Sequence, residues 1–190
     1  MKTLLLLLLL ALDARAQGLV GFYNRNLLDA DTQLLYNAPV TLPDGTGAQG
    51  SSFTAGLFVS QNDTWRLIAT TLFHEMSYGA GFFATLQAVE VPDFAPGASA
   101  TFRARVWETA TGSYENAIAS GQYHGEFVTK SGSPDIFIPN LGYPDPRGPI
   151  PTPDMAGIQP LTLIPEPQSL ALATLGGFLL LAQKLFRRKR

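Results

Sequence analysis

The sequence predicts an all-β protein, with a β-sandwich ectodomain between an N-terminal export signal and a single C-terminal transmembrane helix. Apolar and polar residues alternate with a period of two along several segments of the middle of the chain, as expected for strands that bury one face. Turn-forming residues separate these segments at short intervals, and no long amphipathic helix interrupts them. A β-barrel is the alternative architecture.

Residues 1–16 have the three parts of a secretory signal peptide. A basic start precedes an unbroken leucine run over residues 4–10, and Ala14 and Ala16 supply the small residues of a cleavage site before Gln17. The apolar run is short for a membrane-spanning helix, which needs about 20 apolar residues. We therefore expect export with cleavage, and an uncleaved anchor is the alternative.

The strand pattern is clearest in residues 101–108, where apolar side chains alternate with two arginines and a tryptophan. Residues 52–59 and 64–70 are typical of a hairpin, because turn-forming residues separate two apolar segments. The other expected strands are residues 19–24, 38–42, 82–91, 125–130 and 161–163.

The predicted exported domain, residues 17–163, carries six cationic and thirteen anionic side chains, a net charge of −7. A surface of this sign repels phosphate backbones, so we expect no nucleic-acid partner. The chain has no cysteine, which excludes disulfides, thiolate catalysis and cysteine-based zinc sites. Residues 131–160 hold eight of the 14 prolines and are expected to run extended over the domain surface.

The last region, residues 164–190, predicts a membrane helix over residues 170–186. Residues 170–182 contain no polar stripe, which argues against the alternative of an amphipathic helix in a soluble domain. Cytoplasmic flanks carry an excess of Lys and Arg, so the basic stub that follows predicts a cytoplasmic C-terminus and an external domain. The stub consists of Arg187, Arg188, Lys189 and Arg190.

The motif Pro165-Glu166-Pro167 precedes the apolar helix and the Arg-rich terminus, and all three parts occur in that order. This arrangement resembles the PEP-CTERM sorting signal of Gram-negative bacteria. The resemblance implies recognition by exosortase, a membrane-embedded cysteine protease-transpeptidase that cuts near the motif. It also implies a protein held first at the inner membrane and then sorted to the cell surface or extracellular matrix. It brings no activity for residues 17–163.

Two short motifs partly match signatures of phosphate-binding and zinc protease sites. Residues 45–50 satisfy G-x-G-x-x-G, but a strand pattern follows where phosphate binding requires a helix, so we expect an inter-strand loop. His74-Glu75 begins like a zinc protease motif, but Tyr78 occupies the position of the second histidine. His124 is the one other histidine of the chain, and we expect both to be loop or surface histidines. A three-ligand metal site from His74, His124 and a carboxylate is the alternative.

Carboxylates offer two further candidate sites. Glu108 and Glu115 flank a short turn and are the best pair for cutting a glycosidic bond, which needs carboxylates about 5–10 Å apart. Asp29 and Asp31 could contribute to a calcium site, although the glycine and glutamate of an EF-hand loop are missing. Surface solvation is the expected role of all four, so no metal ion or other cofactor is predicted.

Aromatic side chains could stack on sugar rings, and core packing is the alternative role. The candidates are Trp65, Trp107, Tyr78, Tyr114 and Tyr123, with the two tryptophans as the leading sugar contacts. The sequence as a whole predicts a non-enzymatic structural or adhesive protein of the cell envelope or matrix. A carbohydrate-binding module of an exopolysaccharide matrix is the first alternative, and a glycan-active hydrolase is the second. The expected partners are exosortase, the inner membrane and, for the first alternative, polysaccharide.

Overall fold

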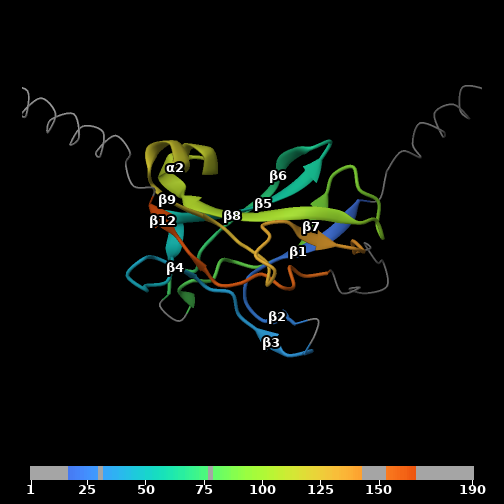
Figure 1. Cartoon of the computed structure of the whole chain (residues 1–190), viewed down its shortest axis with the longest axis horizontal. Helices are drawn as coiled ribbons and strands as arrows, with labels where there is room; N and C mark the ends of the chain where they lie inside the picture. The colour runs from blue at the N-terminus through green and yellow to red at the C-terminus, as the bar shows by residue number, and fades with distance from the viewer. Residues whose placement is uncertain (1–16, 30–31, 77–78, 143–152, 166–190) are drawn as a thin grey trace, which may run out of the picture.

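The computed structural model describes residues 17–29, 32–76, 79–142 and 153–165. These residues form mostly strands, which confirms the all-β prediction (Figure 1). The predicted signal peptide, the predicted helix over 170–186, the basic stub and the residues Glu166 and Pro167 lie outside the described ranges. Within these ranges no helix is both long and apolar enough to cross a membrane.

The largest element is an antiparallel sheet with the order β12-β9-β8-β5-β6, in which β10 pairs with one end of β8. We call this the main sheet. Its long strand β8 buries alternate side chains, as the period-two pattern predicts, whereas β5 is buried on both faces along residues 53–59. The strands are β5 (Phe53–Gln61), β6 (Thr64–Leu72), β8 (Ala100–Glu108), β9 (Tyr123–Glu126), β10 (Ile136–Ile138) and β12 (Ile164–Pro165).

The β5–β6 hairpin confirms the sequence prediction. Asn62 and Asp63 form its two-residue turn, and both have positive φ angles, 49° and 59°. This conformation matches the right-handed twist of the flanking strands, and Asn and Asp tolerate it better than most residues. The Thr64 hydroxyl donates to the Gln61 carbonyl at 2.7 Å and tightens the same turn.

Smaller strand pairs lie on one side of the main sheet, below it in Figure 1. The antiparallel pairs are β1 (Gly18–Phe22) with β7 (Leu86–Val91), and β2 (Leu27–Leu28) with β3 (Leu35–Tyr36). The parallel pair is β4 (Val40–Thr41) with β11 (Leu161–Thr162). The hydrophobic core combines the inward side chains of the main sheet with those of β1, β7 and β4.

Phe83 lies at the centre of an aromatic cluster in this core and is 2% exposed. Its ring centroid is 4.6 Å from that of Phe22, 5.8 Å from that of Phe73 and 6.4 Å from that of Phe127. These partners come from β1, the end of β6 and the segment after β9. The cluster therefore joins the main sheet to the layer beneath it.

Asn24 is a fully buried polar residue that fastens three segments together. Its side-chain amide donates to the carbonyls of Ala38 and Gly81, each at 2.9 Å. Its side-chain oxygen accepts from the Phe83 backbone N–H at 3.2 Å. Buried polar groups are costly unless paired, so the three bonds explain how an asparagine can occupy the core.

The proline-rich segment, residues 131–160, differs from the prediction of a surface strap. Within its described part, β10 pairs with β8, and Ile136 and Ile138 are buried. Leu141, Met155 and Ile158 are also core residues. In the described part, the apolar residues between the prolines decide where the segment packs, and residues 143–152, which hold four of its eight prolines, lie outside the described ranges.

The one α-helix of the described ranges, α2 (Tyr114–Ser120), was not predicted, because seven residues give too short a pattern. The Ser113 side chain caps it by accepting from the Asn116 N–H, and Gly121 ends it in the left-handed conformation. Two 3₁₀ turns, η2 (Gly50–Ser52) and η4 (Thr109–Thr111), precede β5 and follow β8. The glycine-rich loop of residues 45–50 thus leads through η2 into a strand, as expected.

The last described strand includes the first residue of the Pro-Glu-Pro motif. In β12, Ile164 pairs with His124 of β9, and Pro165 pairs with Tyr123. Proline has no N–H to offer a further strand, so it is suited to an edge position. The fold therefore continues through Pro165, and the Pro-Glu-Pro motif begins inside the main sheet.

Candidate functional site

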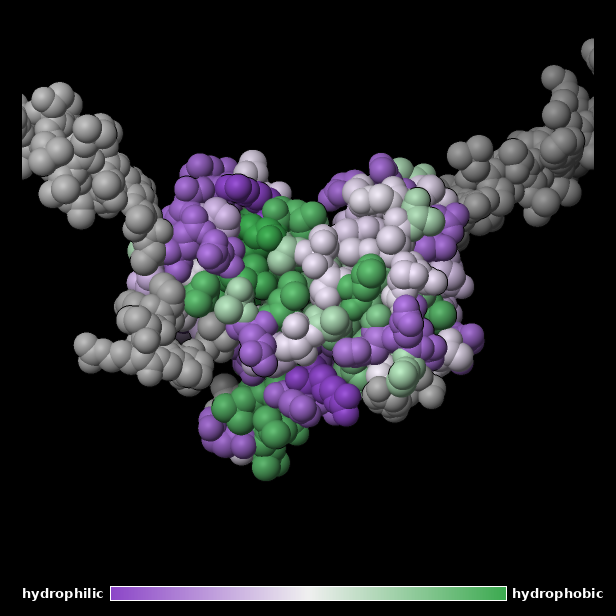
Figure 2. All heavy atoms as spheres, turned by 180° about the vertical axis from the view of Figure 1, so that it is seen from behind, coloured by the Kyte–Doolittle hydropathy of each residue, from purple (hydrophilic) through white to green (hydrophobic). Residues whose placement is uncertain are grey.

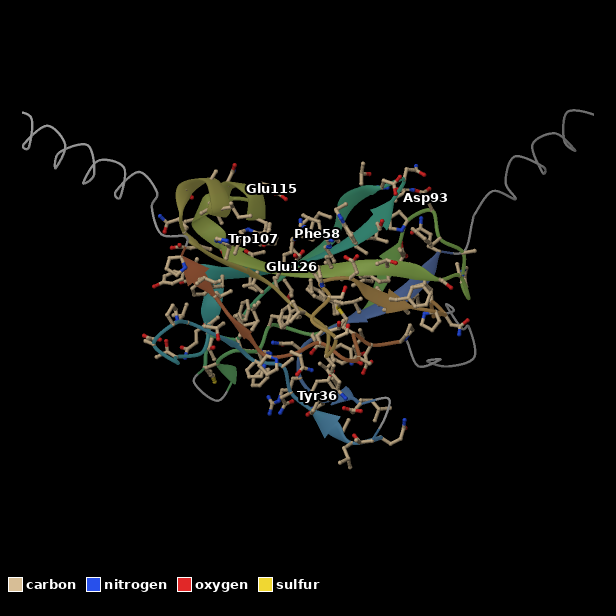
Figure 3. The ribbon with its side chains drawn as sticks, in the orientation of Figure 1. Tyr36, Phe58, Asp93, Trp107, Glu115 and Glu126 are labelled. Atoms are coloured by element: carbon tan, nitrogen blue, oxygen red, sulfur yellow. The ribbon has the colours of Figure 1, made fainter. Side chains whose placement is uncertain are left out.

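The face of the main sheet that points away from the core carries a cluster of charged and aromatic residues. We call it the outer face. The strand register aligns Phe58 with Arg103, and Gly56 with Arg105. Figure 3 shows Phe58 and Trp107 on the same side of the sheet as α2. The alternation along β8 therefore places both arginines and the tryptophan on this face.

Arg105 is the most enclosed cation of the outer face, with 12% of its side chain exposed. Its Nε donates to Glu126 Oε1 at 2.7 Å, and its Nη1 lies 3.5 Å from Glu115 Oε1. The guanidinium carbon also lies 4.8 Å from the ring centroid of Phe58 and 4.7 Å from that of Tyr114. Carboxylates and rings thus occupy the groups through which Arg105 could bind a ligand.

Arg103, two residues before Arg105 in β8, makes similar contacts with carboxylates and an aromatic ring. Its Nε donates to Asp135 Oδ1 at 2.7 Å and lies 3.8 Å from Glu126 Oε1. Its guanidinium carbon lies 4.2 Å from the centroid of the Trp65 ring. Trp65 is half-buried, and Arg103 covers the ring face on that side.

Trp107 is 3% exposed and packs inside the outer face. Its ring lies over Gly56, where an added Cβ would be 2.5 Å from Trp107 Cη2, so only glycine fits beneath it. Phe58 meets the indole edge-on, with ring centroids 6.4 Å apart. The structure therefore does not support Trp107 as a sugar contact, because sugar stacking needs an open ring face.

The tyrosines of the predicted sugar platform also take part in packing. Tyr114, at the start of α2, contacts Arg105 and meets the His124 ring edge-on. Burial raises the pKa of Tyr114, and the nearby Glu126 carboxylate raises it further. Tyr123 is half-buried and meets Phe53 edge-on, and Tyr78 lies outside the described residues. Among the described residues, these aromatic side chains therefore form no open row on this face.

The two carboxylates of the predicted catalytic pair lie in different surroundings. Glu115 reaches Arg105 on the outer face. Glu108 directly follows the outward-facing Trp107, so it has the opposite orientation in β8, and it lines a pocket beyond the end of that strand. The structure does not bring the pair together across a common cleft.

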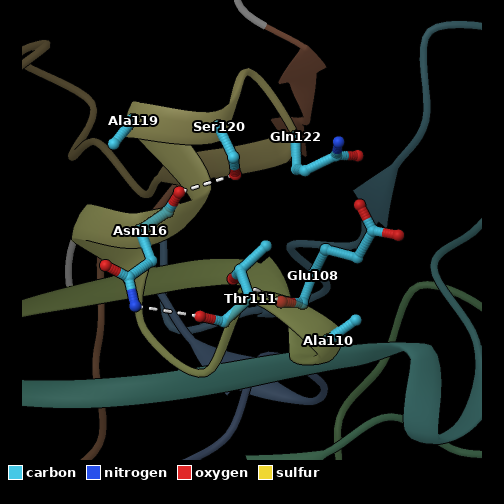
Figure 4. A pocket seen from close by; sticks show the side chains of 7 residues that line it. All are labelled: Glu108, Ala110, Thr111, Asn116, Ala119, Ser120 and Gln122. Carbon is cyan, nitrogen blue, oxygen red and sulfur yellow. Dashed lines mark hydrogen bonds between the residues drawn. The ribbon is translucent and has the colours of Figure 1, made fainter.

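The pocket at the end of β8 was not predicted from the sequence. It lies between η4 and α2 and has a volume of about 660 Å³ (Figure 4). Small or polar side chains line it: Glu108, Ala110, Thr111, Asn116, Ala119, Ser120 and Gln122. Glu108 Oε2 is buried and has no hydrogen-bond partner within the described part of the chain.

The histidines are not brought together, because His74 follows β6 and His124 lies in β9, with β5 and β8 between those strands. Asp29 forms an ion pair with Lys130, and Asp31 lies outside the described ranges. No group of three acidic or histidine ligands that could hold a metal ion occurs among the residues that the structure describes.

Comparison of the chain with protein-family models, curated proteins and solved structures finds no match.

Proposed function

We propose that this chain is an exported, non-enzymatic structural or adhesive component of the cell envelope or matrix. Its C-terminal signal directs its sorting by exosortase, and its domain is a β-sandwich in which the smaller strand pairs form the second layer. The acidic character of residues 17–163, the absence of cysteine and the separation of Glu108 from Glu115 support this proposal. The observation that carries it is the free edge of β6.

β6 forms one edge of the main sheet, and its residues 64–70 pair only with β5 within the described ranges. Beyond them, the Leu72 carbonyl accepts from the Ala84 N–H at 2.8 Å, so that end of the strand is covered. In an edge strand every second residue points its N–H and C=O away from the sheet. Unpaired N–H and C=O groups are therefore available to another strand along 64–70, with the alternation interrupted at Ile68.

The sequence of this edge has few of the features that usually prevent pairing between chains, although Ile68 is an extra residue of β6 that shifts the β5–β6 register. Natural edges are blocked by lysine, proline or bulges on the exposed side. Residues 64–70, Thr-Trp-Arg-Leu-Ile-Ala-Thr, contain one charge and no proline. Leu67 is 44% exposed. This composition favours extension of the sheet by a further strand.

The opposite edge of the main sheet is short in the described residues. β12, which pairs with β9 there, has two residues and includes Pro165, which cannot donate to a further strand. Because β6 offers a longer unpaired edge than β12 or the three-residue β10, two copies can join β6 to β6 in a two-fold symmetric pair. Such pairing gives a matrix protein a means of cohesion that requires no ligand.

Replacement of Leu67 by lysine is expected to abolish this self-association, because the two-fold axis brings the new charges close together. Sedimentation velocity of the full chain in polyoxyethylene detergent should show a dimer for the wild type and a monomer for Leu67→Lys. The matched control is Leu35→Lys on the β2–β3 hairpin, where Leu35 is 68% exposed. This hairpin forms the apolar lobe at the lower end of Figure 2. A monomeric wild type, or equal effects of both substitutions, would contradict the role of the edge.

Processing of the tail is tested on the native cell surface. Mass spectrometry of the mature C-terminus should show loss of the residues beyond the Pro165-Glu166-Pro167 region, because the apolar helix and the basic stub serve only sorting. In cells without exosortase the full tail should persist in the inner membrane fraction. An intact Arg190 on the surface form would count against processing.

A further inference from the structure

The hydroxyl groups that line the pocket between η4 and α2 already donate hydrogen bonds to backbone carbonyls. The Thr111 hydroxyl donates to the Glu108 carbonyl at 2.7 Å. The Ser120 hydroxyl donates to the Asn116 carbonyl at 2.6 Å (Figure 4). The Asn116 side-chain amide donates to the Thr111 carbonyl at 3.1 Å. The two hydroxyls can therefore only accept hydrogen bonds from a ligand.

Two side chains of the pocket have uncommitted polar groups. Glu108 Oε2 is buried without a hydrogen-bond partner among the described residues, an unfavourable state for a carboxylate oxygen. Gln122 is exposed and makes no side-chain hydrogen bond to the described residues, so its amide can both donate and accept. Figure 4 shows the carboxylate and this amide pointing toward the same side of the pocket. In this pocket, the groups that can accept a hydrogen bond from a ligand therefore outnumber those that can donate one.

We propose that this pocket binds a sugar residue of a glycan, with Glu108 accepting hydrogen bonds from sugar hydroxyls and Gln122 donating to one of them. A hydroxyl group both donates and accepts hydrogen bonds. Neighbouring sugar hydroxyls can therefore donate to the acceptor groups of the pocket and accept from the Gln122 amide at the same time. A volume of about 660 Å³ lies within the usual range for small-ligand sites. The small side chains of Ala110 and Ala119 leave room for a ring to enter.

Other ligand classes fit the pocket less well. A divalent cation such as calcium takes six or more oxygen ligands, several of them carboxylates, and Glu108 is the one acidic residue of the pocket lining. An ammonium group has donors only, so it would leave the Gln122 amide donor unused. An acidic sugar would place its carboxylate against that of Glu108. Neutral glycans are therefore the expected ligands.

The site is independent of the free edge of β6, because the pocket is lined by residues of β8, η4, α2 and the turn after α2. It also differs from the aromatic platform that the sequence predicted, since neither Trp65 nor Trp107 lines it. Glycan binding would add a ligand to the proposed matrix role without requiring self-association.

The test is a glycan array probed with the full-length protein in polyoxyethylene detergent, which carries no sugar headgroup, followed by calorimetric titration of the glycans bound. Glu108→Gln keeps the shape and removes the charge, and is expected to weaken binding by about tenfold or more. Ala119→Trp fills the pocket from the exposed side of α2 and is expected to abolish binding while the thermal midpoint is unchanged. Glu115→Gln, on the outer face, is the matched control and should bind as the wild type does.

Several outcomes would overturn the proposal: no glycan bound by the wild type, undiminished binding by Ala119→Trp, or equal losses in Glu108→Gln and Glu115→Gln. Titration with calcium chloride alone provides a further check, and Glu108-dependent heat there would assign a cation site instead. Leu67→Lys should bind glycan normally, so failure of edge pairing and failure of sugar binding are separable results.

Discussion

Replacement of Phe83 by alanine is expected to lower the free energy of unfolding by about 4 kcal/mol. The side chain is 2% exposed and lies against Phe22, Phe73 and Phe127, so its removal leaves a cavity that these rings cannot fill by small shifts. Such a loss is a large part of the total stability of a domain of this size. Urea denaturation of the domain, followed by tryptophan fluorescence, measures the change.

The neighbouring residue provides a matched control. Phe82 is partly exposed, and the Arg25 guanidinium carbon lies 5.5 Å from its ring centroid. Phe82→Ala removes the same number of atoms from the surface, and its cost should be about 1 kcal/mol or less. Similar losses for the two substitutions would show that Phe83 is not the centre of the core.

Replacement of Asn24 by alanine is expected to cost about 3 kcal/mol, because it removes the partners of buried backbone groups. The Phe83 N–H loses its acceptor, and the Ala38 carbonyl loses the side-chain donor. The Gly81 carbonyl still accepts from the Val40 N–H at 2.9 Å, so it is not left unpaired. Thermal unfolding followed by circular dichroism, together with hydrogen exchange of the Phe83 amide, would measure the effect.

Asn37 is the control for this substitution. Its side-chain oxygen accepts from the Asn26 N–H at 2.8 Å at an exposed position, where water can replace it. Asn37→Ala should therefore change the free energy of unfolding by about 0.5 kcal/mol. If Asn24→Ala were equally mild, the network around Asn24 would contribute little to the fold.

Period-two alternation and apolar segments bounded by turn residues were a reliable guide to the long strands. Of these, β8 buries alternate side chains, β5 is buried on both faces along residues 53–59, and β6 is half-buried or exposed throughout. β8, β5 and β6 match the expected segments to within two residues at each end. The pattern was less accurate in two other segments. β7 begins at Leu86, although alternation suggested a start at residue 82, and β9 occupies residues 123–126, where the prediction was 125–130. Bridges and loop contacts replace regular pairing there, and such contacts have no local sequence pattern.

The candidate site was harder to predict, because side-chain type does not specify the partner that a side chain meets. Trp107 is a residue type that often stacks on sugars. Because Gly56 of β5 has no side chain, however, the Trp107 ring packs closely over it and is buried within the outer face. Glu108 and Glu115 are seven positions apart in the sequence, but the end of β8 and the helix α2 direct them to different surroundings. No sequence pattern indicated a binding role for Gln122, since that role depends on the pocket that β8, η4, α2 and the turn after α2 form together.

The sequence alone determined the all-β class and the acidic character of the middle, because alternation and charge are local properties of the chain. The tertiary structure decided which residues of each strand are accessible, that the proline-rich segment contributes to the core, and that β6 keeps a free edge. These outcomes depend on pairing between segments far apart in the sequence. The free energy of that pairing comes from contacts between the two segments, so neither segment alone specifies it.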